Sequence, residues 1–272
     1  MRSLSHNYKG EIIMSTRIEA VIFDWAGTTV DFGCFAPVQA FIKAFEEFGI
    51  TPTVEEIRKP MGMLKSDHIK TMMNMDRIHE EWIKIQGKDF TEEDIDQVYQ
   101  ASEAGILKIL KDFADPKPYV LDAIKTLREM GIKIGSTTGY TDEMMDIVVP
   151  KAAENGYAPD CWFSPNATEN FGRPYPYMIF KNMQTLKVSD VKNVVKVGDT
   201  ISDITEGISA GVITVGVVEG SSIMALSEEQ YNTLSDSEKE EACATVEKKF
   251  KDAGADYIIR NMSELPALIE KL

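Results

Sequence analysis

The fold class of this chain is decided by one stretch, Ile18-Glu19-Ala20-Val21-Ile22-Phe23-Asp24-Trp25-Ala26-Gly27-Thr28-Thr29. Its first six residues are mostly apolar, which is typical of a strand that is buried on both faces of a parallel sheet. An acid, Asp24, ends this run and is soon followed by glycine and threonine. Open α/β sheets bind their ligands in the loops after the carboxyl ends of such strands. The stretch therefore predicts an α/β protein with a ligand site at Asp24.

Further apolar, β-branched runs repeat the strand pattern, at 132–137, 194–198, 212–218 and, more briefly, 257–259. Amphipathic patterns between or after these runs predict helices at 118–130, 141–154, 175–185, 202–210 and 263–271. Alternation of apolar strands with amphipathic helices is typical of a doubly wound parallel sheet. We therefore predict a Rossmann-like α/β core.

Residues 34–112 break this alternation, because they contain several helical patterns and no convincing strand. Pro37 opens a helix that Gly49 stops, as expected from the preference for proline at helix starts and glycine at helix ends. Further helical patterns cover 66–86 and 92–111. We interpret the segment as an α-helical cap inserted after the first strand.

The predicted domains follow from this pattern. Residues 17–33 and 113–272 form the core, and 34–112 form the helical cap. Residues 1–16 are polar and predict a disordered N-terminal extension. A second excursion, 221–252, is acidic and polar, and it predicts a helical surface arm.

The composition argues against several kinds of partner. The 272 residues carry a formal net charge of −15 and have a pI near 4.7. A nucleic-acid or anionic membrane partner would require clustered lysine and arginine, so neither is expected. No run approaches the ~20 apolar residues of a membrane helix, and three widely spaced cysteines are typical of reduced thiols in a cytosolic protein. We predict a cytoplasmic protein that acts on a small molecule.

Four motifs with potential catalytic or ligand-binding residues lie at predicted strand ends or in the loops beside them. They are Asp24 in its stretch, Thr138 in Ser136-Thr137-Thr138-Gly139, Arg173 in Phe171-Gly172-Arg173-Pro174-Tyr175-Pro176, and Asp199 with Asp203 in Val197-Gly198-Asp199-Thr200-Ile201-Ser202-Asp203. Taken alone, each motif is equally typical of a helix cap or a turn. Four such motifs in this order, each beside a strand, indicate one shared site.

In these motifs the chain resembles the haloacid dehalogenase superfamily, over essentially all of the predicted core and cap. The resemblance implies that Asp24 is a nucleophile that accepts a phosphoryl group. It also implies that Thr138 holds a phosphoryl oxygen, that Arg173 is the basic residue of the third motif, and that Asp199 binds Mg²⁺. Asp203 would support the ion from behind its ligands or bind it directly. The residue types agree, because Mg²⁺ favours carboxylate, carbonyl and water oxygens beside substrate phosphates.

One position departs from the superfamily. Its phosphatases usually carry a second acid two residues after the nucleophile, and that acid protonates the leaving oxygen. Here the position is Ala26, which offers only its backbone carbonyl, as a further ligand of Mg²⁺. An alkoxide leaving group would lack its general acid. Either the chain is a phosphatase that has lost most of its activity, or the leaving group of its reaction is not an alkoxide.

Lys65 favours the second alternative. It lies in the predicted cap, in Met61-Gly62-Met63-Leu64-Lys65-Ser66-Asp67-His68-Ile69, near a predicted helix start. By itself it would more often be a solvent-exposed lysine. Amines form Schiff bases with aldehydes, however, and the iminium accepts the electrons of a breaking bond. A C–P bond next to an aldehyde can then break without a proton on oxygen. A Schiff base on Lys65 would therefore make a general acid at position 26 unnecessary, and this accounts for Ala26.

This combination, together with the segment 61–69, closely resembles the phosphonatase (phosphonoacetaldehyde hydrolase) family. The resemblance implies that the substrate is a small phosphonate, phosphonoacetaldehyde, whose C–P bond is hydrolysed to acetaldehyde and phosphate. It also implies a Schiff base on Lys65 and an aspartyl-phosphate on Asp24. A homodimer formed through the caps is implied as well.

Four further residues join the predicted site. His68 lies three residues beyond Lys65, on the same face if both are helical, and the resemblance implies that it moves protons during imine formation. A buried or capping histidine is the alternative. Tyr140, just after the second motif, and Met61 are predicted to line the substrate pocket, and Cys34 at the cap junction is predicted to form part of its wall.

Two other functions stay open. An ordinary phosphatase or phosphomutase of the same superfamily would act on phosphate esters, and Ala26 argues against it. A binding protein that kept the fold without the chemistry would be expected to lack Asp24, Asp199 or Arg173, and all three are present.

Overall fold

The computed structural model describes residues 18–272, so the predicted disordered extension 1–16 lies outside the described residues. In the described part, five strands form one sheet in the order β2-β1-β3-β4-β5, and every neighbouring pair is parallel. The strands are β1 (Ala20–Phe23), β2 (Lys133–Ser136), β3 (Val194–Gly198), β4 (Ile213–Val217) and β5 (Tyr257–Ile259). The predicted parallel α/β core is therefore confirmed.

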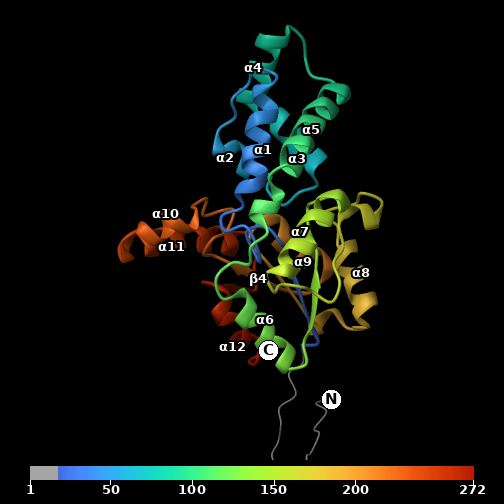
Figure 1. Cartoon of the computed structure of the whole chain (residues 1–272), viewed down its shortest axis with the longest axis vertical. Helices are drawn as coiled ribbons and strands as arrows, with labels where there is room; N and C mark the ends of the chain where they lie inside the picture. Colours follow the sequence, from blue (N-terminus) through green and yellow to red (C-terminus); the bar gives the residue numbers. More distant parts are fainter. Residues whose placement is uncertain (1–17) are drawn as a thin grey trace, which may run out of the picture.

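Helices cover both faces of the sheet (Figure 1), because successive residues of each strand point to opposite faces. Val21 and Phe23 of β1 pack into one helical layer, whereas Ala20 and Ile22 pack into the other. The first layer consists of α6 (Val120–Glu129), α7 (Asp142–Glu154) and α12 (Leu265–Ile269). The second consists of α8 (Tyr177–Leu186), α9 (Ile201–Ala210) and α11 (Asp236–Asp252).

Five more helices stand above the sheet in Figure 1, with no strand among them in the described chain. They are α1 (Phe35–Glu46), α2 (Val54–Arg58), α3 (Lys65–Met73), α4 (Asp76–Gln86) and α5 (Glu92–Leu107). Their buried apolar side chains, among them Phe41, Phe45 and Trp82, form a cluster of their own, separate from the clusters on the sheet. We interpret these helices as the predicted cap, whose boundaries at 34 and 112 stay a prediction.

The first cap helix begins earlier than its proline suggests. The Asp31 carboxylate accepts hydrogen bonds from the backbone amides of Phe35 (2.9 Å) and Ala36 (3.1 Å), so α1 starts at Phe35. Pro37 lies within the first turn, where a missing amide proton removes no helical hydrogen bond.

The predicted helix 66–86 is in fact two helices, α3 and α4. The Asn74 side-chain amide donates to the Lys70 carbonyl at 2.7 Å, and Met75 is extended, so the chain turns between them. The predicted helix 92–111 ends at Leu107. Short 3-10 helices complete the described chain, at Leu110–Phe113, Pro165–Thr168, Val191–Asn193 and Met262–Glu264.

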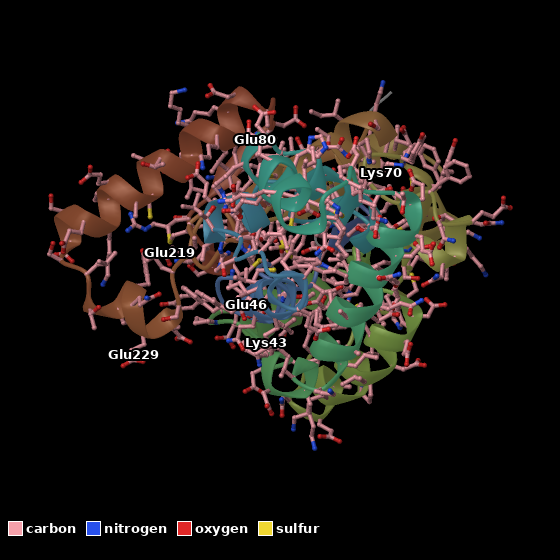
Figure 2. The ribbon with its side chains drawn as sticks, turned by 90° about the horizontal axis from the view of Figure 1, so that it is seen from above. Lys43, Glu46, Lys70, Glu80, Glu219 and Glu229 are labelled. Atoms are coloured by element: carbon pink, nitrogen blue, oxygen red, sulfur yellow. The ribbon has the colours of Figure 1, made fainter. Side chains whose placement is uncertain are left out.

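The predicted surface arm is only partly correct. α10 (Glu228–Thr233) and α11 extend to one side of the core (Figure 1), and the view from above places Glu229 on that outer side (Figure 2). One face of α11 is nevertheless buried, with Cys243, Val246 and Phe250 in an apolar cluster. A Cβ on Gly216 of β4 would lie 2.7 Å from the Phe250 ring, so this ring packs directly on the strand. The arm is therefore anchored to the sheet.

Among the helices of residues 18–272, none is long and apolar enough to cross a membrane.

Candidate active site

Asp24 lies directly after β1, beside the ends of β2 and β3. Its backbone amide donates to the Val197 carbonyl at 2.9 Å, so the sheet fixes its position. The residue is 5% exposed, and Arg173 Nη2 donates to its Oδ1 at 2.6 Å. Burial, and then the charge of Asp203, raise the pKa of Asp24 in spite of Arg173. The carboxylate is held in place but its charge is only partly compensated.

Three buried acids, Asp24, Asp199 and Asp203, each bring one carboxylate oxygen within 4.8 Å of the others. Two neutral donors hold Asp199, the Thr28 hydroxyl at Oδ1 (2.8 Å) and the Ser222 amide at Oδ2 (2.7 Å). Burial, and next the charges of Asp24 and Asp203, raise the pKa of Asp199 to about 8. Buried carboxylates this close ionise together only beside a cation, and their hard oxygen atoms suit a divalent one. These residues therefore fit a divalent metal ion.

The loop after Asp24 approaches Asp199 so closely that glycine is required at position 27. Gly27 has a φ of +86°, and a Cβ there would lie 2.2 Å from Asp199 Oδ2. The preceding residue, Ala26, is half-buried and contributes only a methyl group. The acid that would protonate an ester oxygen is therefore missing from this loop.

Asp203 is held by hydrogen bonds at one carboxylate oxygen and by two cationic side chains at the other. Oδ2 accepts from the amide (3.1 Å) and hydroxyl (2.6 Å) of Thr200, which caps α9. Oδ1 lies 3.1 Å from Arg173 Nη2 and 3.0 Å from Lys196 Nζ. Burial alone would raise the pKa of Asp203, but Arg173 and Lys196 outweigh it and lower the pKa. Of the two predicted roles, this geometry favours support from behind the metal ligands.

Two buried residues that the sequence analysis did not identify, Lys196 and Glu206, hold Arg173 in place. Glu206 Oε2 accepts from Arg173 Nε (3.0 Å) and from the Thr137 hydroxyl (3.0 Å). Lys196 Nζ donates to Thr137 Oγ1 at 2.7 Å and lies 3.3 Å from Glu206. The sequence did contain one sign of these contacts, a lysine inside the apolar β3 run. Lysine is almost never fully buried unless it is paired, so this position indicated a buried acidic partner.

Thr138 and Tyr140 lie just after β2, where the second motif is expected. Both are buried, and the Tyr140 amide donates to Thr138 Oγ1 at 3.0 Å. The Tyr140 hydroxyl is buried and has no hydrogen-bond partner in the described chain. Burial raises the pKa of Tyr140 well above its usual range, so the phenol keeps its proton. This hydroxyl is available to a ligand.

Lys65 is the first residue of α3 and is only 4% exposed. Its Nζ lies 5.0 Å from the centroid of the Tyr140 ring and 5.6 Å from that of the Phe41 ring. Among residues 18–272 it forms no ion pair. Burial lowers the pKa of Lys65 to about 8, so roughly a tenth of the amine is neutral at pH 7. The solvent-exposed alternative is therefore wrong.

His68 is fully buried on α3, and its ring lies 4.2 Å from the Phe41 ring, centroid to centroid. Neither ring nitrogen has a well-formed hydrogen bond in the described chain. Burial, and then the charge of Lys65, lower the pKa of His68 well below its usual range, which outweighs a small opposing contribution from the Ile57 backbone. The ring is therefore neutral, and its role as a proton carrier stays a prediction.

The cap meets the core around the segment that precedes Lys65. The Ser202 hydroxyl donates to the Met61 carbonyl at 3.1 Å, and Arg173 Nη1 donates to the Gly62 carbonyl at 3.3 Å. A Cβ on Gly139 would lie 2.8 Å from the Met63 carbonyl oxygen, so the two segments are in direct contact. This contact shields Lys65 and Asp24 from solvent.

Cys34 and Met61 are both buried at this boundary. Cys34 has a φ of +53° and directly precedes α1. Burial raises the pKa of Cys34 well above its usual range, so it is present as a neutral thiol. The structure thus brings all the predicted site residues to one region, at the ends of the central strands and the facing edge of the cap.

The profile of the haloacid dehalogenase-like hydrolases matches residues 18–211, which include the cap helices and the acids after β1 and β3. The chain therefore belongs to the haloacid dehalogenase-like hydrolase family. A β-phosphoglucomutase from Clostridium difficile shares its fold alone, with a TM-score of 0.65 and 16% identity.

Within this family the chain falls among the phosphonoacetaldehyde hydrolases. It is 51% identical over 256 residues to the phosphonoacetaldehyde hydrolase of Lysinibacillus sphaericus, which covers 94% of this chain and 95% of that protein. The Bacteroides fragilis protein of the same name is 50% identical over 254 residues, covering 93% and 96%. The crystal structure of a phosphonoacetaldehyde hydrolase-like protein from Oleispira antarctica matches with a TM-score of 0.91 and 36% identity, covering 98% and 96%.

Proposed function

We propose that this chain hydrolyses phosphonoacetaldehyde to acetaldehyde and phosphate, with Lys65 and Asp24 as its two covalent catalysts. The relatives named phosphonoacetaldehyde hydrolase support the reaction. The observation that carries the mechanism is the environment of Lys65, a buried amine of lowered pKa that has no carboxylate partner in the described chain. An amine in this state is a nucleophile toward aldehydes.

In the first step, the neutral amine of Lys65 attacks the aldehyde carbon. The hydroxyl of the adduct then takes up a proton and leaves as water, and an iminium remains. The Tyr140 ring, 5.0 Å from Nζ, stabilises the positive charge of this iminium. His68 is neutral and lies on the same helix, so it can accept a proton from the condensing amine. The docked cap keeps bulk water away from the iminium.

In the second step, the Asp24 carboxylate attacks phosphorus. The electron pair of the C–P bond moves into the iminium, so the leaving group is a neutral enamine on Lys65 and the phosphoryl group is bound to Asp24. Arg173, which already contacts Asp24, holds the phosphoryl oxygens together with Thr138. No proton is needed on the leaving group, and this is consistent with alanine at position 26.

The remaining steps return the enzyme to its starting state. Protonation of the enamine carbon regenerates an iminium, and water hydrolyses it to acetaldehyde and the free amine, with release of one proton. A second water hydrolyses the aspartyl-phosphate. Condensation releases one water and the two hydrolyses consume two, so one water is consumed per turnover.

Mg²⁺ is the cation that we propose for the acidic cluster, with Asp24, Asp199 and the Ala26 carbonyl as its protein ligands. When bound, it allows an anionic carboxylate to approach an anionic phosphonate. Treatment with EDTA should abolish phosphate release, and Mg²⁺ should restore it. Borohydride trapping at Lys65 should survive EDTA, because imine formation needs only the amine. Full phosphate release by rigorously metal-free protein would contradict the assignment.

The lowered pKa of Lys65 predicts how imine formation depends on pH. The amine reacts only when neutral, so the reactive fraction should rise roughly tenfold per pH unit up to a pKa of about 8 and level off above it. The measurement is the single-turnover rate of imine formation between pH 6 and pH 10, in metal-free protein. A midpoint near 10.5, the ordinary lysine value, would show that Lys65 is not activated by burial.

Restoring an acid at position 26 should not accelerate C–P cleavage, because an enamine leaving group takes no proton from it. Ala26→Asp adds a carboxylate beside Asp24 and Asp199, so phosphonate turnover should fall while weak phosphate-ester hydrolysis appears. Both activities are followed by phosphate release, with wild type as the reference. Wild-type ester hydrolysis as efficient as phosphonate hydrolysis would favour the phosphatase alternative instead.

The test of the function itself combines two readouts on the wild-type protein. Phosphonoacetaldehyde should yield equal amounts of phosphate and acetaldehyde. With borohydride present, activity should be lost, and mass spectrometry should find a reduced adduct on the peptide that contains Lys65. Phosphate release from sugar or aryl phosphates, without an adduct from phosphonoacetaldehyde, would establish the phosphatase alternative.

A homodimer formed through the cap stays a proposal as well. Light scattering after size-exclusion chromatography should give twice the mass of one 30.4 kDa chain. A monomer at micromolar concentration would contradict it.

A further inference from the structure

We propose that Arg58 is a positioning residue that ties the cap to Asp199 through the backbone of Ser222. The inference rests on the proposed metal site, in which Asp199 is a ligand. Arg58 is the last residue of α2 in the cap. Ser222 belongs to the loop that joins β4 to α10 in the core.

Ser222 is held from two sides. Its amide donates to Asp199 Oδ2 at 2.7 Å, and its carbonyl accepts from Arg58 Nη1 at 2.9 Å. The same Nη1 donates to the Gly33 carbonyl at 2.6 Å, in the segment that leads into α1. One guanidinium therefore joins the cap helix, the connection to the cap, and the loop that supports Asp199.

Lys117 fixes the other end of the same loop. Its Nζ donates to the carbonyls of Glu219 (2.9 Å) and Gly220 (3.0 Å), and also to the carbonyl of Gly27 beside Asp199. Figure 2 shows Glu219 between the cap helix that carries Glu46 and the α10–α11 arm. Because the loop is anchored at 219–220, movement of Arg58 with the cap acts mainly on the stretch that ends at Ser222.

The contacts of Arg58 are few for a half-buried arginine. Its Nε and Nη2 are buried without a hydrogen-bond partner in the described chain, and so is the hydroxyl of Ser222. Unpaired buried donors cost free energy, so an arginine that only stabilised the fold would be expected to use them. The guanidinium instead lies over the Phe35 ring, 4.9 Å from its centroid. The two bonds of Nη1 are the specific contacts by which Arg58 joins the cap to the core.

Through Ser222, Arg58 affects the orientation of the proposed metal ligand Asp199. With the cap docked, Arg58 holds Ser222 so that its amide stays on Asp199 Oδ2, and the Thr28 hydroxyl holds Oδ1. Asp199 is then oriented before the ion arrives. Because coupling between two equilibria is reciprocal, a bound ion in turn favours the docked cap.

The test measures metal affinity without substrate. Mn²⁺ binding is followed by electron paramagnetic resonance, and Mg²⁺ affinity is obtained by competition. Arg58→Met keeps an unbranched side chain but removes every donor, and it should weaken Mg²⁺ binding roughly tenfold, the scale of one lost charge-assisted hydrogen bond. The unfolding temperature of the metal-free protein should change little, which separates positioning from a general structural role.

A matched control comes from the same region. Arg77→Met also removes a cap arginine, but Arg77 pairs with Glu56 and Glu81 inside the cap, so Mg²⁺ affinity should not change.

An unchanged Mg²⁺ affinity in folded Arg58→Met would overturn the inference, and so would an equal loss in Arg77→Met. If Arg58→Met does not fold, Arg58→Lys decides, because lysine can replace only part of the two-carbonyl contact. It should bind Mg²⁺ about threefold more weakly, and wild-type affinity would overturn the inference. No phosphonate enters these assays, so their outcome is independent of Schiff-base trapping at Lys65.

Discussion

Lys65→Arg should abolish C–P bond cleavage, with a loss on the order of 10⁴-fold or more, as expected when a covalent catalyst is removed. Arginine keeps the positive charge and can still lie over the Tyr140 ring, which is 5.0 Å from Nζ in the wild type. The guanidinium stays protonated at any working pH, however, and cannot condense with an aldehyde. The variant should therefore bind the phosphonate and Mg²⁺ but release no phosphate.

Lys70→Arg is the matched control for this variant. Lys70 lies on the same helix, but its side chain is 50% exposed and pairs with Glu92. Its replacement should leave phosphate release and trapping at Lys65 unchanged. Lys65→Ala should fail like Lys65→Arg, and a small added amine should restore a trace of activity. Substantial turnover by Lys65→Arg, or an adduct on another lysine, would remove the Schiff-base role of Lys65.

The features that could be predicted from the sequence have local signals. β1 is an apolar run that ends in Asp24, and the carboxyl ends of parallel strands meet at one edge of a sheet. This rule alone brings Asp24, Thr138 and Asp199 together, and the structure places all three there. Strand ends can be located because the apolar run gives way there to polar residues, which stay buried as parts of the site.

Two of the residues that were missed, Glu206 and Arg58, lack such a local signal. Glu206 looks like any helical glutamate, and its burial depends on Arg173 and Lys196, which arrive from other parts of the chain. The same holds for Arg58, whose partners Gly33 and Ser222 lie 25 and 164 residues away. Contacts between segments this far apart depend on the tertiary fold, and no period in the sequence encodes them.

The break between α3 and α4 has a different cause. Residues 66–86 have a continuous helical pattern, but the Asn74 side chain competes for the Lys70 carbonyl. Asparagine makes such bonds to the backbone readily, and this is why it favours helix ends over helix interiors. Asn74 alone indicated the break, whereas the residues around it have a helical pattern that predicts one continuous helix.

Asp24→Asn should reduce phosphate release by several orders of magnitude, because the amide has nearly the same shape but cannot attack phosphorus. The variant should nonetheless fold. Burial and Asp203 raise the pKa of Asp24, so the charged form of this carboxyl is less favourable in the folded metal-free protein than in the unfolded chain. A neutral amide removes this cost, and the loss of the Arg173 contact opposes the gain. The unfolding temperature in EDTA should therefore stay close to that of the wild type.

The two covalent catalysts can be separated by what borohydride traps. The amine of Lys65 is intact in Asp24→Asn, so phosphonoacetaldehyde should still condense with it. Because the C–P bond cannot break, the reduced adduct should be a phosphonoethyl group on Lys65. In the wild type, trapping during turnover should give an ethyl group, since the phosphoryl group has already been transferred to Asp24. An ethyl adduct in Asp24→Asn, or near-normal phosphate release, would show that another group receives the phosphoryl group. A phosphonoethyl adduct with no phosphate would mean that imine formation precedes phosphoryl transfer and does not depend on it.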